Sequence, residues 1–155
     1  MTEGDLPSRR GRAIGIDLGT RRIGVAVSDS AGTMALPRTT LVRGKDIDGD
    51  RRRLVELILE EEAVVVVIGL PLSLDGSRGR AAVAAEAEAE ALRGLLGERG
   101  IGVELFDERL TTVSAHQALA AGGTRERDRR GVVDKAAAAV MLTAWLEGRR
   151  GGSPS

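Results

Sequence analysis

Cysteine is missing altogether from this chain of 155 residues, so it forms no disulfide, no thiolate metal site and no thiol nucleophile. Aromatic residues are nearly absent too, since Phe106 and Trp145 are the only two. A platform that stacks successive single-stranded bases on aromatic faces is therefore excluded. The lack of cysteine suits a reducing compartment, and we expect a cytoplasmic protein.

Long apolar runs are also lacking. The longest is Ala63–Leu70, far short of the roughly 20 residues that a membrane-spanning helix needs. Residues 1–12 are charged throughout and do not read as a secretory segment. We therefore expect no membrane partner.

Net charge is zero, because 23 basic residues face 23 acidic ones. A protein that coats nucleic acid without specificity is thereby disfavoured, although a local basic patch is still allowed. Only Lys45 and Lys135 are lysines, and all other basic residues are arginines. The arginine fork suits phosphate recognition, but codon composition produces the same bias, so the count alone carries little weight.

The length fits one domain, because a chain of about 150 residues buries roughly 70% of its unfolded surface. We expect residues 1–11 to form a flexible arm, residues 12–147 a single α/β domain and residues 148–155 a flexible tail. Glycine, proline, serine and charged residues dominate both ends.

The first part of the domain has the pattern of an antiparallel meander. Alternating β-branched residues predict strands over residues 12–17 and 22–28, joined by a tight turn. A third strand is predicted over residues 33–42. Pro37 places it at an edge of the sheet, because proline cannot donate a ladder hydrogen bond.

The remainder alternates helices and strands. Residues 63–68 form an uninterrupted apolar run, which is typical of a strand covered by helices on both faces. A fifth strand is predicted over residues 101–106. Helices are predicted over residues 46–62, 80–97, 110–121 and 132–146, with the polar stretch 122–131 between the last two. The whole predicts a mixed five-stranded sheet, with three antiparallel strands followed by two parallel strands and helices on both faces.

Acidic residues fall where the predicted strands end. Asp17 closes the first strand, Asp107 and Glu108 close the fifth, and Asp134 opens the last helix. Each has an ordinary structural explanation, as a turn cap, a solvated acid or a favourable charge at a helix N-terminus. Neighbouring strand residues point to opposite faces, so only one of Asp107 and Glu108 is expected to share a site with Asp17.

Together these acids indicate a metal site, because a cluster of carboxylates repels itself unless a cation fills it. Hard divalent ions with oxygen ligands are the usual solution. Two such ions stabilise both the attacking and the leaving oxygen in phosphoryl displacement. The sequence supplies the ligands without fixing the distances between them.

Four motifs resemble the YqgF family, also called RuvX, which is related to ribonuclease H-like nucleases. They are the run from Ile14 to Asp29 with its Gly-Ile-Asp-Leu-Gly-Thr core, Gly69-Leu-Pro71, Asp107-Glu-Arg-Leu-Thr-Thr112 and Asp134. The resemblance covers residues 12 to 146. It implies a ribonuclease H-like fold and a nuclease that processes the 5′ end of pre-16S ribosomal RNA, with resolution of Holliday junctions as the alternative.

The resemblance also implies a ligand set for Mg²⁺ or Mn²⁺, made of Asp17, an acid of the Asp-Glu-Arg motif, and Asp134. We favour Glu108 over Asp107, although strand alternation does not decide between them. Related resolvases carry two acids on the final helix, whereas the residue three beyond Asp134 is Ala137. This difference weakens any two-ion mechanism taken over from them.

Arginines near these acids are candidate nucleic-acid contacts, with surface ion pairs as the alternative explanation. Residues 125–130 hold four arginines and two acids and are predicted to form a flexible loop that closes on a strand. The candidates are Arg21, Arg22, Arg109, Arg125, Arg127, Arg129 and Arg130.

Two other classes of protein compete with a nuclease. Gly15 to Thr20 also resembles the first phosphate loop of actin, Hsp70 chaperones and sugar kinases, but those proteins close two such domains around ATP. A non-catalytic RNA-binding assembly factor on the same fold is the second alternative. The expected partner is precursor rRNA or branched DNA, and a symmetric junction favours a homodimer.

Overall fold

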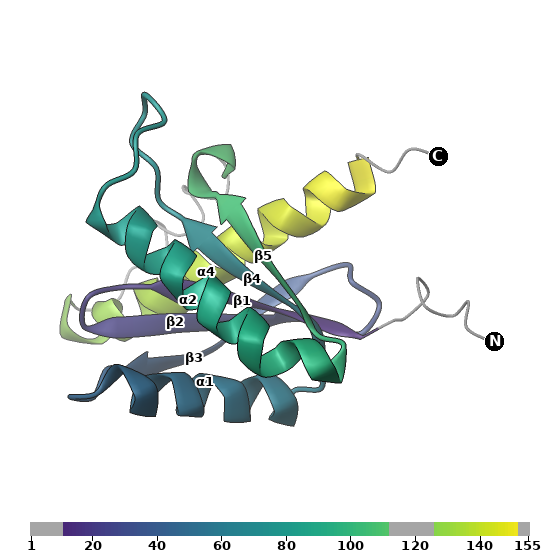
Figure 1. Ribbon diagram of the computed structural model, residues 1–155. Coiled ribbons are helices and arrows are strands. Elements are labelled where there is room, and N and C mark those ends of the chain that lie inside the picture. Colours follow the sequence, from purple (N-terminus) through teal and green to yellow (C-terminus); the bar gives the residue numbers. More distant parts are fainter. Residues whose placement is uncertain (1–10, 112–125, 152–155) are drawn as a thin grey trace.

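The computed structural model describes residues 11–111 and 126–151, with the side chains of the last helix described from residue 134 to 149. Its strands form one mixed sheet in the order β3-β2-β1-β4-β5 (Figure 1). β1, β2 and β3 are antiparallel, and β4 and β5 lie parallel to β1, which confirms the predicted topology. The strands are β1 (Arg12–Leu18), β2 (Arg22–Ser28), β3 (Ala35–Val42), β4 (Ala63–Leu70) and β5 (Gly102–Asp107).

Three α-helices and two short 3₁₀ helices complete the described fold. They are α1 (Ile47–Glu60), α2 (Arg80–Leu96), η2 (Gly97–Arg99), η3 (Glu108–Leu110) and α4 (Glu126–Gly151). Asp46 caps α1 by accepting a hydrogen bond from the backbone N–H of Asp48 at 3.0 Å. No helix within these ranges is both long and apolar enough to cross a membrane.

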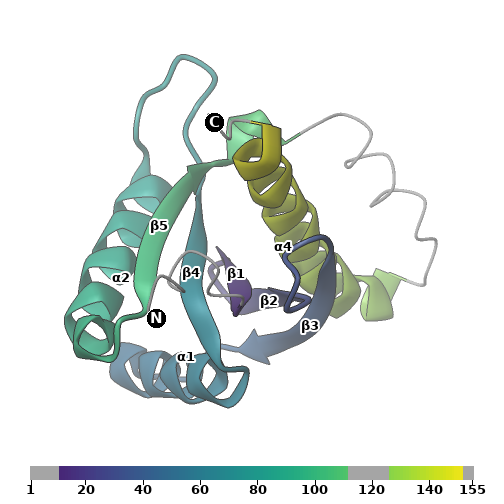
Figure 2. The same cartoon turned by 90° about the vertical axis from the view of Figure 1, so that its right-hand side faces the viewer.

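Helices cover both faces of the sheet, as expected, with α1 and α2 on one face and α4 on the other (Figure 2). Side chains of β1 alternate between the two cores. Ile14 and Ile16 pack toward α1 and α2, whereas Ala13 packs toward α4. On the α4 side an added Cβ at Gly15 would lie 3.0 Å from Leu142 Cβ, so the glycine lets the helix approach closely. By the same alternation, Asp17 lies on the α4 face.

Several predicted boundaries need correction. α4 begins at Glu126, so residues 126–131 are helical and do not form the expected loop, and the helix runs on to Gly151 inside the expected tail. The helix predicted from Leu110 does not start there, because η3 ends at Leu110 and Thr111 is extended. The rest of that prediction, residues 112–121, lies outside the described residues. β3 begins at Ala35 and is an edge strand, as Pro37 predicted.

Candidate active site

Asp17 stands in the middle of the sheet, at the end of β1 where the chain turns toward β2. Its Cα pairs with that of Gly24 on β2, and on the other side Ile16 pairs with Ile68 of β4. The next residue of β4 on the α4 face is Gly69. Asp17 therefore has a glycine on each neighbouring strand, and each glycine makes room for another acidic residue.

Gly24 leaves the space in which the backbone of Asp134 packs against β2. A Cβ at Gly24 would overlap the backbone carbonyl of Asp134, so the helix backbone rests directly on β2 at this point. Asp134 lies well inside α4, which begins at Glu126, and is not at its N-terminus as predicted. The absence of a side chain at Gly24 thus allows the backbone of α4 at Asp134 to lie against β2, near the end of β1.

Gly69 in the same way leaves the space that the side chain of Glu108 occupies. A Cβ there would overlap the Oε2 atom of Glu108, so the carboxyl group lies over β4 on the side facing α4. From the sequence, Gly69 is recognisable only as part of a motif, and its role in making room for Glu108 is not apparent. A signal was present, because Gly69 interrupts a run of valine and isoleucine at a position that shares a face with Val65 and Val67.

Glu108 and Asp17 share a hydrogen bond and repel each other as charges. Burial, the Asp17 charge, the hydrogen bond to Asp17 and the Asp107 charge together raise the pKa of Glu108 to about 7. Burial and the Asp134 charge also raise the pKa of Asp17, while its hydrogen bond with Glu108 acts in the opposite direction. The shared bond therefore has Glu108 as the protonated donor and Asp17 as the ionised acceptor.

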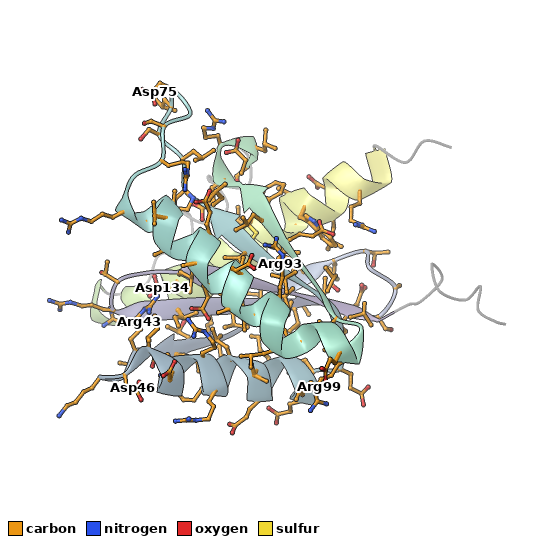
Figure 3. All side chains as sticks on the ribbon, in the orientation of Figure 1. Arg43, Asp46, Asp75, Arg93, Arg99 and Asp134 are labelled. Atoms are coloured by element: carbon orange, nitrogen blue, oxygen red, sulfur yellow. The ribbon has the colours of Figure 1, made fainter. Side chains whose placement is uncertain are left out.

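Asp134 completes the electrostatic group. Burial raises its pKa, and the nearby Arg22 guanidinium lowers it. Asp17 of β1 is therefore influenced by two other acids, Asp134 of α4 and Glu108 of η3. Figure 3 shows Asp134 at the end where the β1–β2 turn lies.

The donor set suits a hard divalent cation, because a cation would offset the burial and the repulsion that raise the pKa values of Asp17 and Glu108. In the described part of the chain, however, no three acidic or histidine side chains come close enough together to hold a metal ion as they stand. Among the described residues the acids interact in pairs, Asp17 with Glu108 and Asp17 with Asp134.

Asp107, the alternative to Glu108, is directed elsewhere. It caps η3 by accepting a hydrogen bond from the backbone N–H of Arg109 at 3.0 Å. Its carboxylate also accepts hydrogen bonds from the Arg109 side chain, from Nε at 3.0 and 3.1 Å to its two oxygens and from NH2 at 2.7 Å. These contacts with Arg109 hold the pKa of Asp107 below its usual value. Asp107 is therefore neutralised by Arg109 and does not join Asp17.

The candidate arginines separate into three groups. Arg109 is engaged by Asp107, and Arg22 lies in the field of Asp134. Arg21 is exposed on the β1–β2 turn, and no described side chain pairs with it. Arg125 lies outside the described residues. Arg127, Arg129 and Arg130 lie on the helical backbone of α4, and their side chains lie outside the described part.

Solved structures establish the class of fold. RuvC of T. thermophilus in complex with a Holliday junction substrate has a TM-score of 0.57 and 16% identity, over 92% of this chain and 97% of that one. The yeast mitochondrial Holliday junction resolvase Ydc2 has a TM-score of 0.54 and 10% identity, over 91% and 80% of the two chains. The fold is therefore ribonuclease H-like.

Sequence comparison then narrows the class to a family. The model described as "RuvX: Holliday junction resolvase" matches residues 11–148, and the chain belongs to this family. A Mycobacterium sp. (strain KMS) protein is 45% identical over 97% of this chain and 93% of its own. A Nocardia farcinica (strain IFM 10152) protein is 47% identical over 90% and 79%. Both relatives bear the name "Putative pre-16S rRNA nuclease", and the resemblance noted in the sequence is confirmed.

Proposed function

We propose that this chain is a divalent-metal-dependent nuclease that hydrolyses phosphodiester bonds, and that its substrate is the 5′ end of pre-16S rRNA in the cytoplasm. The proposal is supported by the interaction of Asp17 with both Glu108 and Asp134, and by the raised pKa of each of the three acids. Such perturbation is typical of functional carboxylates. The substrate is taken from the names of the relatives.

Each carboxylate has a defined task in this proposal. Asp17 provides the central oxygen ligand from a rigid strand, Asp134 provides a second from the helix seated on Gly24, and Glu108 provides a third once it loses its proton. Mg²⁺ or Mn²⁺ bound there would polarise the phosphate and lower the pKa of a coordinated water. The exposed Arg21 contacts a substrate phosphate beside Asp17.

A four-way DNA junction is the second candidate substrate. It is favoured by the description of the matching family as a Holliday junction resolvase. The two candidates differ in sugar and in branching, so one enzyme preparation distinguishes them when both are offered together.

The test is a cleavage assay on the purified full chain with Mg²⁺ or Mn²⁺, using labelled precursor rRNA ends and a four-way DNA junction side by side. Asp17→Asn is expected to reduce the cleavage rate about 100-fold or more, because it removes one anionic ligand and its electrostatic contribution. The control is Glu98→Gln, an exposed acid on η2 at the opposite end of the sheet. Cleavage by Asp17→Asn at the wild-type rate would refute the proposal.

A further inference from the structure

The segment between β4 and α2 presents an apolar side chain to solvent at the end of the sheet where β5 leads into η3. Leu74 is 93% exposed, whereas the other exposed large hydrophobic residues reach at most 65%. The segment projects away from the sheet at the end where β4 and β5 terminate, and Asp75 marks its tip (Figures 1 and 3). A single exposed leucine is ordinary, so the structure around it decides its significance.

The projecting segment has a defined turn. Ser73 donates its N–H to the carbonyl of Ser77 at 3.0 Å, and Gly76 donates to the carbonyl of Ser73 at 2.8 Å. The N–H of Ser77 is bound by the Asp75 carboxylate at 2.9 Å. Gly76 has φ +88°, a conformation that favours glycine. The leucine is therefore displayed on a turn with internal hydrogen bonds.

Arg109 attaches this turn to the site. Its NH1 donates to the carbonyl of Leu74 at 3.3 Å, while Nε and NH2 hold Asp107. The charge of Arg109 also acts on Asp75, which offsets the one acid at the tip. Because Arg109 directly follows Glu108, the position of Leu74 is tied to that of the carboxylate pair. The next residue, Leu110, is itself 63% exposed.

We propose that Leu74 is a second point of contact with the nucleic acid, where its side chain packs against bases that are unstacked beside the phosphate held by the carboxylates. This rests on the proposed function and specifies the substrate as a nucleic acid with unpaired or splayed nucleotides at the cleavage position. A leucine offers no hydrogen bond to phosphate, but it gains from contact with a base face or from insertion at a base step.

Local charge agrees with a nucleic-acid partner. Arg80 begins α2 directly behind the turn and is exposed, and no described acidic side chain pairs with it. An arginine beside an apolar tip gives the phosphate contact that positions a strand, while the tip contacts the bases. The chain has only two aromatic residues, so an aliphatic side chain takes the role that an aromatic one often has in base stacking.

The test measures binding in an Asp17→Asn background, so that no cleavage interferes. One probe is an oligonucleotide duplex with an unpaired extension that carries 2-aminopurine at the junction, and the other is a fully paired duplex of equal length. Leu74→Ala is expected to weaken binding of the first probe about tenfold and of the second less than about twofold. It should also reduce the 2-aminopurine fluorescence change, and Leu74→Met should retain both.

Leu95→Ala is the matched control, since Leu95 is also an exposed leucine, 54% exposed, near the distant end of α2. It should leave both affinities unchanged. Equal binding by Leu74→Ala and its parent, equal losses on both probes, or an equal loss with Leu95→Ala would overturn the contact.

Outcomes for the two proposals are separable. If Leu74-dependent binding is found but the wild-type chain cuts neither substrate, the nuclease proposal fails and the contact stands. If the wild-type chain cuts and Leu74→Ala binds normally, the contact alone fails. Absence of nucleic-acid binding in both backgrounds overturns the two together.

Discussion

Glu108 is the residue on which the chemistry of the proposed site depends. Its pKa of about 7 means that near neutral pH the site exchanges between a proton shared with Asp17 and a set of free carboxylates. A metal ion competes with that proton, because ligands must be deprotonated to bind. Cleavage should therefore rise with pH through about 7.

The same shift makes Glu108 a source of pH-dependent stability in metal-free protein. Its pKa is higher in the folded chain, about 7, than the usual 4.5. Between these values the folded state holds a proton that the unfolded state has released, so the free energy of unfolding falls as pH rises. Glu108→Gln should flatten this dependence and stabilise the protein at pH 8 by about 1 to 2 kcal/mol, since solvent screening reduces the full effect of the shift.

Thermal unfolding in EDTA at pH 4.5 and at pH 8 measures this effect. The gain should be present at the higher pH and small at the lower one, where Glu108 is protonated in the folded state and already about half protonated in the unfolded state. Glu98→Gln should show no such difference between the two pH values. A stability gain of equal size at both pH values would contradict the assigned cause.

A substitution at Gly69 tests whether the position of the Glu108 carboxylate affects cleavage independently of the stability of the fold. In Gly69→Ala the new methyl group meets only the end of the Glu108 side chain, which can swing away. We expect a loss of cleavage of about tenfold or more from misplacement of this carboxylate, with less than about 1 kcal/mol lost in stability. Gly24→Ala is the comparison, because there the methyl group meets helix backbone, and we expect a loss of about 1 to 3 kcal/mol.

Parallel kinetic and denaturant measurements on the two glycine variants test this account. If Gly69→Ala cuts at the wild-type rate, the placement of Glu108 over β4 does not matter for the reaction.

Among the elements, α1 ends in an unfavourable backbone conformation. Glu62 has φ 57°, in the left-handed region, where a non-glycine residue is strained. Glu62→Gly should stabilise the protein by about 0.5 to 1 kcal/mol. Glu60→Gly, two residues earlier and still helical, should destabilise it by about 1 kcal/mol. Chemical denaturation of both variants measures the change in the free energy of unfolding. Destabilisation by Glu62→Gly would refute the argument.

The strands and their relative directions followed from local pattern, because alternation and the uninterrupted apolar run of β4 are dictated by burial on one face or on two. The extent of α4 did not follow. Residues 126–131 are dense in charge, which favoured a loop, yet their backbone is helical and continuous with a segment packed on β1 and β2. Local composition here is overridden by the longer element to which the segment belongs.

The site could be predicted only in outline. Sequence placed Asp17 and the Asp107–Glu108 pair at strand ends, but the choice between the pair depends on a 3₁₀ turn after β5 that alternation does not describe. Asp107 pairs with Arg109 two residues later, and Arg109 also contacts the turn at Leu74, which is distant in sequence. Only the folded chain reveals such contacts.

At the scale of the whole molecule, two cores of different width position the site. Large aliphatic side chains separate the sheet from α1 and α2, whereas alanine and glycine on the other face let α4 lie close to β1 and β2. This close approach is what brings Asp134 near Asp17. The nuclease chemistry therefore depends on small residues far along the chain from the acids that they serve.

The central claim is that Asp17, Glu108 and Asp134 form one divalent-cation site, and calorimetric titration of the metal-free chain with Mn²⁺ tests it most directly. The account predicts saturable binding at pH 8, weaker binding with proton release at pH 6, loss of binding in Asp17→Asn and unchanged binding in Glu98→Gln. Binding that is equally strong in Asp17→Asn, or that does not depend on pH between 6 and 8, would contradict it.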